Sequence, residues 1–215
     1  MNNIVLQTNN LTKKYGGFTA LDNVSIQLEK KHIYGFIGEN GAGKTTLMKI
    51  ITGLSFPTAG TYSILGKASP RDREKMRRHI GSMIEDPALY PHYTIRQNLE
   101  LQRTLVGNPD KAVCDEVLDL VGLADVKHKR VRTLSMGMKQ RLSIAMALIG
   151  KPQILILDEP STDWTPRTLS LCEICSRGWR KRKKSPFSSP ATSSASFTSL
   201  PRTIFSFTKA RSLMC

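Results

Sequence analysis

Residues 38–45 form the segment whose residue types and spacing most directly indicate a chemical function. In order they are Gly38, Glu39, Asn40, Gly41, Ala42, Gly43, Lys44 and Thr45. This order matches a phosphate-binding loop in full, in which glycines let successive backbone N–H groups face phosphate oxygens. Lys44 would offer positive charge to the phosphates, and the Thr45 hydroxyl would be a magnesium ligand. The alternative, a chance glycine turn before a helix, is disfavoured by the complete pattern.

A second chemical pair, Asp158 and Glu159, follows the apolar run 154–157. A carboxylate at the end of a strand can hold magnesium, and its neighbour can polarise an attacking water. Taken alone, an Asp-Glu pair is a weak signal that more often caps a strand in solvent. Together with the glycine loop it is strong, because parallel strands would present both sites at the same edge of a sheet.

The elements that must position these residues alternate between strand and helix. Apolar patterning predicts strands at 32–37, 80–84 and 154–157, the last fully apolar as in a buried parallel sheet. Helical spacing predicts helices at 45–54, 94–105, 110–123 and 135–149, of which the middle two would form an inserted helical subdomain. Residues 4–6 and 24–28 are expected to be antiparallel strands around a turn, with another strand at 61–65. Residues 70–80 are strongly charged and predict a solvated helix or loop.

Residues 134–141, Leu-Ser-Met-Gly-Met-Lys-Gln-Arg, resemble the signature of ATP-binding cassette (ABC) ATPases. The resemblance covers residues 2–160 and implies an α/β P-loop NTPase core with an N-terminal antiparallel β piece. In that family the signature grips the γ-phosphate held by a second subunit, at a helix N-terminus. Carried over, the residues that act on the partner's site are Leu134, Ser135, Met136, Gly137 and Gln140. The alternative is an amphipathic helix with a serine cap.

The same resemblance implies further site residues. Tyr15 lies where the family stacks an aromatic ring on adenine, although a lone tyrosine is more often a packing residue. Thr46 joins the nucleotide-binding loop. Glu85 stands where the family has a glutamine that senses magnesium and the membrane partner, and it would itself be a metal ligand. Glutamate there, followed by a proline and then by a Tyr-Pro pair, looks like exporters of bacitracin- or lantibiotic-type peptides.

The composition separates residues 161–215 from the rest. This segment has 10 Lys/Arg against 2 Asp/Glu and contains 12 serines, so it is expected to be a low-order tail. Its Cys172 and Cys175 form a lone CxxC, which is too few ligands for a zinc site. The N-terminus lacks the pattern of a signal peptide, and no apolar run is long enough to span a bilayer. The expected location is the cytoplasm, peripheral at the inner face of the membrane through a membrane partner.

The family's motifs stop at Pro160. Its D-loop should follow, and a histidine loop should come about thirty residues later, but this chain has no histidine after His128. A reading-frame shift is our hypothesis, and a natural divergent tail is the alternative. When the third base of each codon is read with the next two, Asp163-Trp164-Thr165 forces Leu-Asp, which is part of the missing D-loop. Without the later strands, 154–157 is expected to lose part of its cover, which predicts a marginally stable or aggregating protein.

The sequence therefore predicts an ABC domain at 2–160 with an incomplete C-terminal part, and a tail at 161–215. The expected function is ATP binding and hydrolysis that drives export through a separate membrane subunit, in a homodimer of ATP-binding subunits. ATP and Mg²⁺ are the expected cofactors, Glu159 the general base, and Asp158 with Thr45 the metal ligands. No nucleic acid is expected as a partner, although a protein acting on nucleic acid or ribosomes is an alternative. An inert pseudogene product is another.

Overall fold

The computed structural model describes residues 3–30, 32–36, 38–85, 88–158 and 204–206. An antiparallel sheet comprises β1 (Ile4–Tyr15), β2 (Phe18–Val24), β3 (Gln27–Glu29) and β5 (Ala59–Ile64), with strand order β2-β1-β3 and β5 paired with β1. A parallel sheet has the order β4-β8-β7-β6, from β4 (Ile33–Gly35), β6 (Ile80–Met83), β7 (Ile154–Leu157) and β8 (Ile204–Ser206). The helices are α1 (Lys44–Thr52), α2 (Pro70–Arg77), α3 (Ile95–Leu105), α4 (Val113–Val121) and α5 (Met136–Leu148), and short 3-10 turns occur at Ala124–Val126 and Val131–Thr133.

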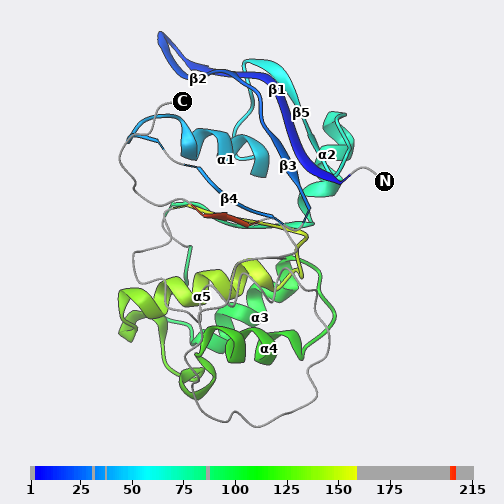
Figure 1. The fold of residues 1–215 in the computed structure, drawn as a ribbon. Coiled ribbons are helices and arrows are strands. Elements are labelled where there is room, and N and C mark those ends of the chain that lie inside the picture. The colour runs from blue at the N-terminus through cyan, green and yellow to red at the C-terminus, as the bar shows by residue number, and fades with distance from the viewer. Residues whose placement is uncertain (1–2, 31, 37, 86–87, 159–203, 207–215) are drawn as a thin grey trace, which may run out of the picture.

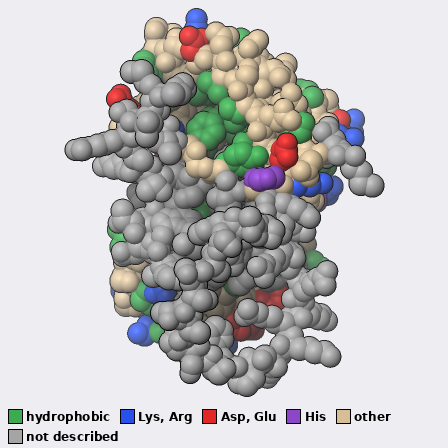
Figure 2. Space-filling view, viewed as in Figure 1, with side chains coloured by type: hydrophobic (Ala, Val, Ile, Leu, Met, Phe, Trp, Pro, Cys, Tyr) green, Lys and Arg blue, Asp and Glu red, His purple; other side chains and the backbone are tan. Residues whose placement is uncertain are grey.

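These elements form layers around the parallel sheet (Figure 1). Helix α1 lies between the two sheets, and α3, α4 and α5 lie on the other side of the parallel sheet. This arrangement confirms the α/β core, the N-terminal antiparallel piece and the inserted helices. Figure 2 shows apolar side chains gathered in the upper half of the same view, which holds α1 and the antiparallel sheet.

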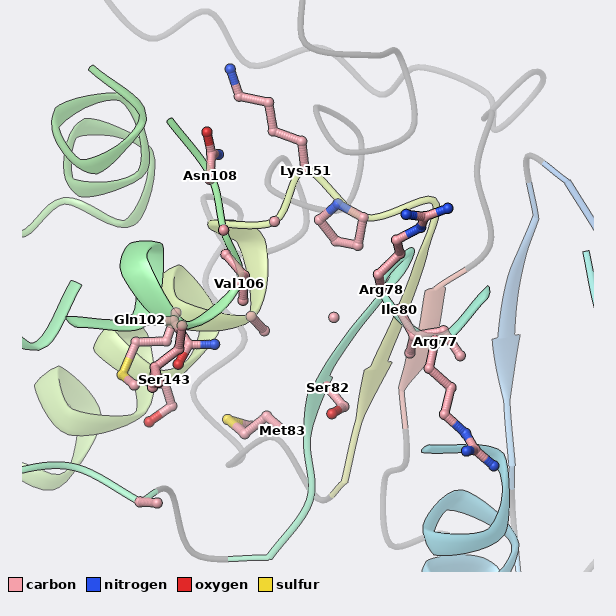
Figure 3. A pocket seen from close by; sticks show the side chains of 18 of the residues that line it. Arg77, Arg78, Ile80, Ser82, Met83, Gln102, Val106, Asn108, Ser143 and Lys151 are labelled. Carbon is pink, nitrogen blue, oxygen red and sulfur yellow. The ribbon is translucent and has the colours of Figure 1, made fainter. Parts of the chain in front are cut away.

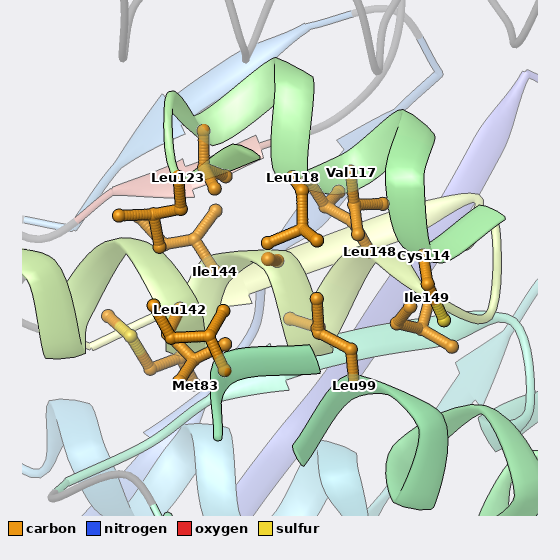
Figure 4. Packing of buried hydrophobic residues seen from close by; sticks show 14 of the residues in the cluster. Met83, Leu99, Cys114, Val117, Leu118, Leu123, Leu142, Ile144, Leu148 and Ile149 are labelled. Carbon is orange, nitrogen blue, oxygen red and sulfur yellow. The ribbon is translucent and has the colours of Figure 1, made fainter. Parts of the chain in front are cut away.

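Strand β7 is apolar throughout because it has a hydrophobic core on each face. Ile154 and Ile156 belong to the cluster shared with α1 and the antiparallel sheet. Leu155 and Leu157 belong to the cluster formed with α3, α4 and α5, part of which Figure 4 shows. Alternate residues of a strand point to opposite faces, so a strand covered on both sides contains no polar position.

One cysteine belongs to the second of these clusters. Cys114 on α4 is buried, and burial raises the pKa of its thiol to about 11. At neutral pH the group is a neutral, apolar packing side chain.

The N-terminal hairpin differs from the prediction. Residues 15–23 were expected to contain the turn between strands at 4–6 and 24–28, but β1 runs to Tyr15 and β2 begins at Phe18. The turn is the Gly16-Gly17 pair, with Gly16 in the left-handed region at φ 56°. Two-residue hairpin turns favour glycine for this reason, and the pair was the available signal.

Three residues of the expected tail are described. Ile204–Ser206 forms β8, parallel to β4 on one side and to β7 on the other. The other residues of the segment 161–215 lie outside the described residues, so the tail stays a prediction. In the structure the four side chains of β7 are buried and both of its edges are paired. Without β8, the backbone N–H and C=O groups on the facing edges of β4 and β7 would lack hydrogen-bond partners. Strand β8 pairs with both edges and provides these partners.

Candidate functional site

The glycine loop ends at Gly43, which starts α1 without a side-chain cap. Gly43 has φ 83°, and no side chain accepts a hydrogen bond from the first turn, which also contains no acidic residue. The first N–H groups of a helix have no partner within the helix, and they carry the positive end of its dipole. The start of α1 is therefore open to an anion. Because a Cβ at Gly43 would overlap the carbonyl oxygen of Ala20, only glycine fits there.

Lys44 and Thr45 follow at the start of the helix. The Lys44 ammonium donates hydrogen bonds to the carbonyl oxygens of Gly38 and Glu39, both at 2.7 Å. It is thereby held over its own loop, where phosphates would lie. Thr46 is partly buried on the same first turn.

The Thr45 hydroxyl reaches the second chemical segment. It donates a hydrogen bond of 2.9 Å to a carboxylate oxygen of Asp158, a residue 113 positions away. Asp158 is 8% exposed, and its backbone N–H donates to the carbonyl of Met83 at the end of β6. The expected meeting of the two motifs at one sheet edge is thus present. Glu159, the expected general base, lies outside the described residues.

These residues fit a magnesium–nucleotide complex. An uncapped helix start with a lysine beside it suits phosphate groups, and a hydroxyl within hydrogen-bond distance of a buried carboxylate provides two hard oxygen ligands for magnesium. Within the described ranges, no three His, Cys, Asp or Glu side chains gather as a metal site of their own.

Glu85 forms an ion pair with Lys49, and its role as a metal ligand stays a prediction. Its carboxylate accepts a hydrogen bond of 2.6 Å from Lys49, one turn after Thr45 on α1. This contact with Glu85 raises the pKa of Lys49. The sequence did not single out Lys49; the available signal was a basic residue four positions after Thr45, the expected magnesium ligand.

Tyr15 is half exposed at the end of β1. The ammonium of Lys13 lies 4.6 Å from the centre of its ring, and its hydroxyl is 3.4 Å from the hydroxyl of Ser55, beyond the end of α1. These contacts leave much of the ring accessible, as stacking on a base would require.

The signature residues lie at the start of α5. Ser135 caps this helix by accepting a hydrogen bond of 3.3 Å from the Met138 N–H, while Leu134 is buried as an anchor. Met136 is 77% exposed, and a Cβ at Gly137 would meet no atom within 4 Å. Gln140 is partly buried. The start of α5 is thus capped by Ser135 and exposed at Met136.

A cavity of about 940 Å³ lies away from the glycine loop, between β6 and the helical subdomain. Figure 3 shows Gln102, Val106 and Ser143 on one side of it and Arg78, Ile80 and Ser82 on the other. Among the lining residues, Leu54 and Leu105 are largely exposed and Val106 and Tyr90 about half exposed. The loop that carries Tyr90 is fixed by Asn98, whose amide bonds both the N–H and the carbonyl of Tyr90.

No helix among the residues that the structure describes has the length and apolar character needed to span a bilayer. The cavity walls mix apolar with basic side chains, including Arg78 and Lys151.

Comparison with known proteins gives consistent matches. The sequence model of the ABC transporter family matches residues 21–162. An uncharacterized ABC transporter ATP-binding protein of Bacillus subtilis, YcbN, is 47% identical over 162 residues, which are 75% of this chain and 53% of that protein. The bacitracin transport ATP-binding protein BcrA of Bacillus licheniformis is 42% identical, with the same two coverages. The lantibiotic transport ATP-binding protein SrtF of Streptococcus pyogenes is 42% identical over 75% of this chain and 69% of its own length.

Solved structures agree with the fold. An ATP-binding subunit of an ABC transporter superposes with a TM-score of 0.67 at 26% identity, over 78% of this chain and 71% of the other. A dimeric ATP-binding cassette, solved in a post-hydrolysis state with ADP and Pi, has a TM-score of 0.66 at 27% identity, over 77% and 78% of the two chains. The chain spans about half the length of the first relatives it matches.

Proposed function

The chain belongs to the ABC transporter family, and from that premise we propose that it is a transporter's ATP-binding subunit, which binds and hydrolyses ATP. The observation that carries the proposal is the hydrogen bond from Thr45 to Asp158, beside the uncapped start of α1. It joins the phosphate-binding loop to the end of the apolar strand, as a magnesium–ATP site requires.

In this proposal different residues of the chain contact the phosphates, the metal, the attacking water and the adenine. The loop N–H groups and Lys44 bind the phosphates, Thr45 and Asp158 orient the metal, and Glu159 accepts a proton from the attacking water. Magnesium, when bound, neutralises phosphate charge. Tyr15 stacks on the adenine, and Glu85 lies at the edge of the metal site.

A second copy completes each site. Ser135 and Gly137 at the exposed start of α5 would contact the γ-phosphate held by the partner's glycine loop, so a homodimer would enclose two ATP molecules. The related cassette solved with ADP and Pi is dimeric, which supports this arrangement.

The cavity between β6 and the helical subdomain would receive a membrane subunit. Its exposed apolar walls and basic rim suit a helix with an apolar face and acidic ends. This association would place the chain at the inner face of the membrane. Identity of 42% to both BcrA and SrtF supports a peptide antibiotic as the exported substrate.

The domain boundary belongs to the same proposal, with an ABC domain over 2–160 and an out-of-frame segment over 161–215. The match to the family model ends at residue 162, two positions after Pro160, which supports a change of frame there. Such a change would remove the D-loop and the histidine loop and impair turnover. Sequencing the encoding DNA tests it, because early stop codons in the alternative frame would exclude the idea.

Turnover tests the proposed activity. ATP hydrolysis by the purified chain should be slow, it should rise in a version with the frame restored, and Glu159→Gln should abolish it in that version. A restored chain that hydrolyses ATP equally well with glutamine at position 159 would contradict the assigned base. A restored chain without any turnover would contradict the proposed function.

A further inference from the structure

Lys49 and Glu85 form an ion pair next to the proposed nucleotide site. Their charged atoms are 2.6 Å apart, with the Lys49 side chain 32% exposed and that of Glu85 61% exposed. Lys49 projects from α1, and Glu85 lies two residues beyond the end of β6. The pair therefore joins the phosphate-loop helix to the loop that follows β6.

This pair lies one helical turn from the metal ligands. Residues four apart on a helix are neighbours on the same face, so Lys49 is next to Thr45, which bonds Asp158. Lys49 also interacts electrostatically with Asp158. A second carboxylate brought to this place without a counter-charge would repel both Asp158 and an incoming polyphosphate.

The backbone of Glu85 adds a second observation. Its φ of 58° lies in the left-handed region, which is uncommon for a residue with a Cβ. A residue held in such a conformation needs neighbouring contacts that fix it. Lys49 provides a short, charged contact of this kind.

We propose that Lys49 is a positioning residue that holds the Glu85 loop against α1 and neutralises the glutamate beside the nucleotide site. The inference rests on the proposed function, since it concerns nucleotide binding at that site. It explains how glutamate can replace a neutral side chain there without weakening the attraction for phosphate. Lys49 and Glu85 act as one unit, so their effects on binding depend on each other.

Binding of a fluorescent ATP analogue with magnesium tests the proposal. Lys49→Met should weaken binding about fivefold, because a single uncompensated charge in a partly solvated site has an effect of that order. Glu85→Gln removes the other charge of the pair and is the reference with which the double variant is compared. The double variant should bind like Glu85→Gln, because removal of the glutamate makes the lysine unnecessary.

A matched control is Lys127→Met, which removes a lysine of similar exposure that pairs with Asp115 in the helical subdomain. It should bind the analogue like the unmodified chain. Thermal unfolding of every variant separates binding from folding. If Lys49→Met does not unfold cooperatively, the proposal is tested by comparing the double variant with Glu85→Gln. The double variant lacks both charges of the pair, so its binding shows whether the lysine matters without the glutamate.

Equal weakening in Lys49→Met and in the double variant would overturn the proposal, since the lysine would then act on the phosphates directly or only on folding. Unchanged binding by Lys49→Met would also overturn it. An unmodified chain that fails to bind would refute the proposed function and this inference together. Binding by the unmodified chain without rescue in the double variant would refute this inference alone.

Discussion

Gly43 shows how a single residue sets the shape of the site. It combines a left-handed backbone with a close approach to the Ala20 carbonyl, so the loop can lie against β2 and α1 can begin without a cap. The glycine loop could be predicted from the sequence because its glycines allow the backbone conformations that a phosphate-binding loop requires. The contact of Gly43 with Ala20 could not be predicted, because the sequence of a hairpin does not indicate which loop packs against it.

We expect Gly43→Ala to lower the free energy of unfolding by about 2 kcal/mol or more, because it adds both strain and overlap. Gly41→Ala is the matched control. Gly41 has a similar φ of 87°, but a Cβ there would meet no atom within 4 Å, so only about 1 kcal/mol should be lost. Chemical denaturation measures both, and equal losses would contradict the account.

The pairing of Lys49 with Glu85 could not be predicted from the sequence. Glu85 was noticed as a departure from a family pattern and interpreted as a metal ligand. Its pairing with Lys49 depends on the distance between the last turn of α1 and the loop after β6. Such a distance follows from packing and cannot be read from residues 36 positions apart.

Among the elements, α3 and α4 are tied together by charge as well as by apolar contacts. Arg96 on α3 bonds Glu100 on the same helix and Asp115 on α4, while Arg103 bonds Glu100 and Lys127 bonds Asp115. The neighbouring Arg103 and Arg96 lower the pKa of Glu100, and Arg96 and Lys127 lower that of Asp115.

The pH dependence of stability follows from these two lowered pKa values. A carboxyl group whose pKa falls on folding stabilises the native state above its unfolded pKa, and this contribution is lost as the pH falls through the folded pKa. The loss should therefore begin below about pH 4.5. The double variant Glu100→Gln/Asp115→Asn should be less stable at pH 7 but lose less stability on acidification. Melting curves from pH 7 to 3 measure this, and parallel curves for the two proteins would contradict it.

Element assignment from the sequence succeeded where the apolar pattern is strong. The amphipathic helices α3 and α4, the largely apolar helix α5 and the apolar strand β7 were predicted close to their observed bounds. The hairpin was misread because β2 contains polar residues on an exposed surface, so its alternation is weak. The short strand β8 could not be predicted, since three residues carry no measurable period and their place is set by the open position between β4 and β7.

For the whole molecule, β8 closes the parallel sheet with residues from the far end of the sequence. Each of its residues pairs with β4, and the same three pair with β7. Strand β7, which leads to Asp158, is therefore an inner strand whose position depends on a segment near residue 205.

Phe205→Pro should destabilise the fold by about 3 kcal/mol, because proline removes an N–H and is not accommodated in an inner strand. Phe205→Val is the control, since valine keeps the backbone donor and suits a strand. Thermal unfolding distinguishes the two. A proline variant as stable as the valine variant would show that β8 does not support the sheet.

The account depends most on the proposed magnesium–nucleotide site at Thr45 and Asp158. The most direct measurement is equilibrium binding of ATP with and without magnesium, by the unmodified chain and by Thr45→Val. Valine keeps the shape of threonine but lacks the hydroxyl that bonds Asp158. We predict that magnesium tightens ATP binding by the unmodified chain and has little effect on the valine variant. Binding that magnesium does not change, or that changes equally in both proteins, would contradict the account.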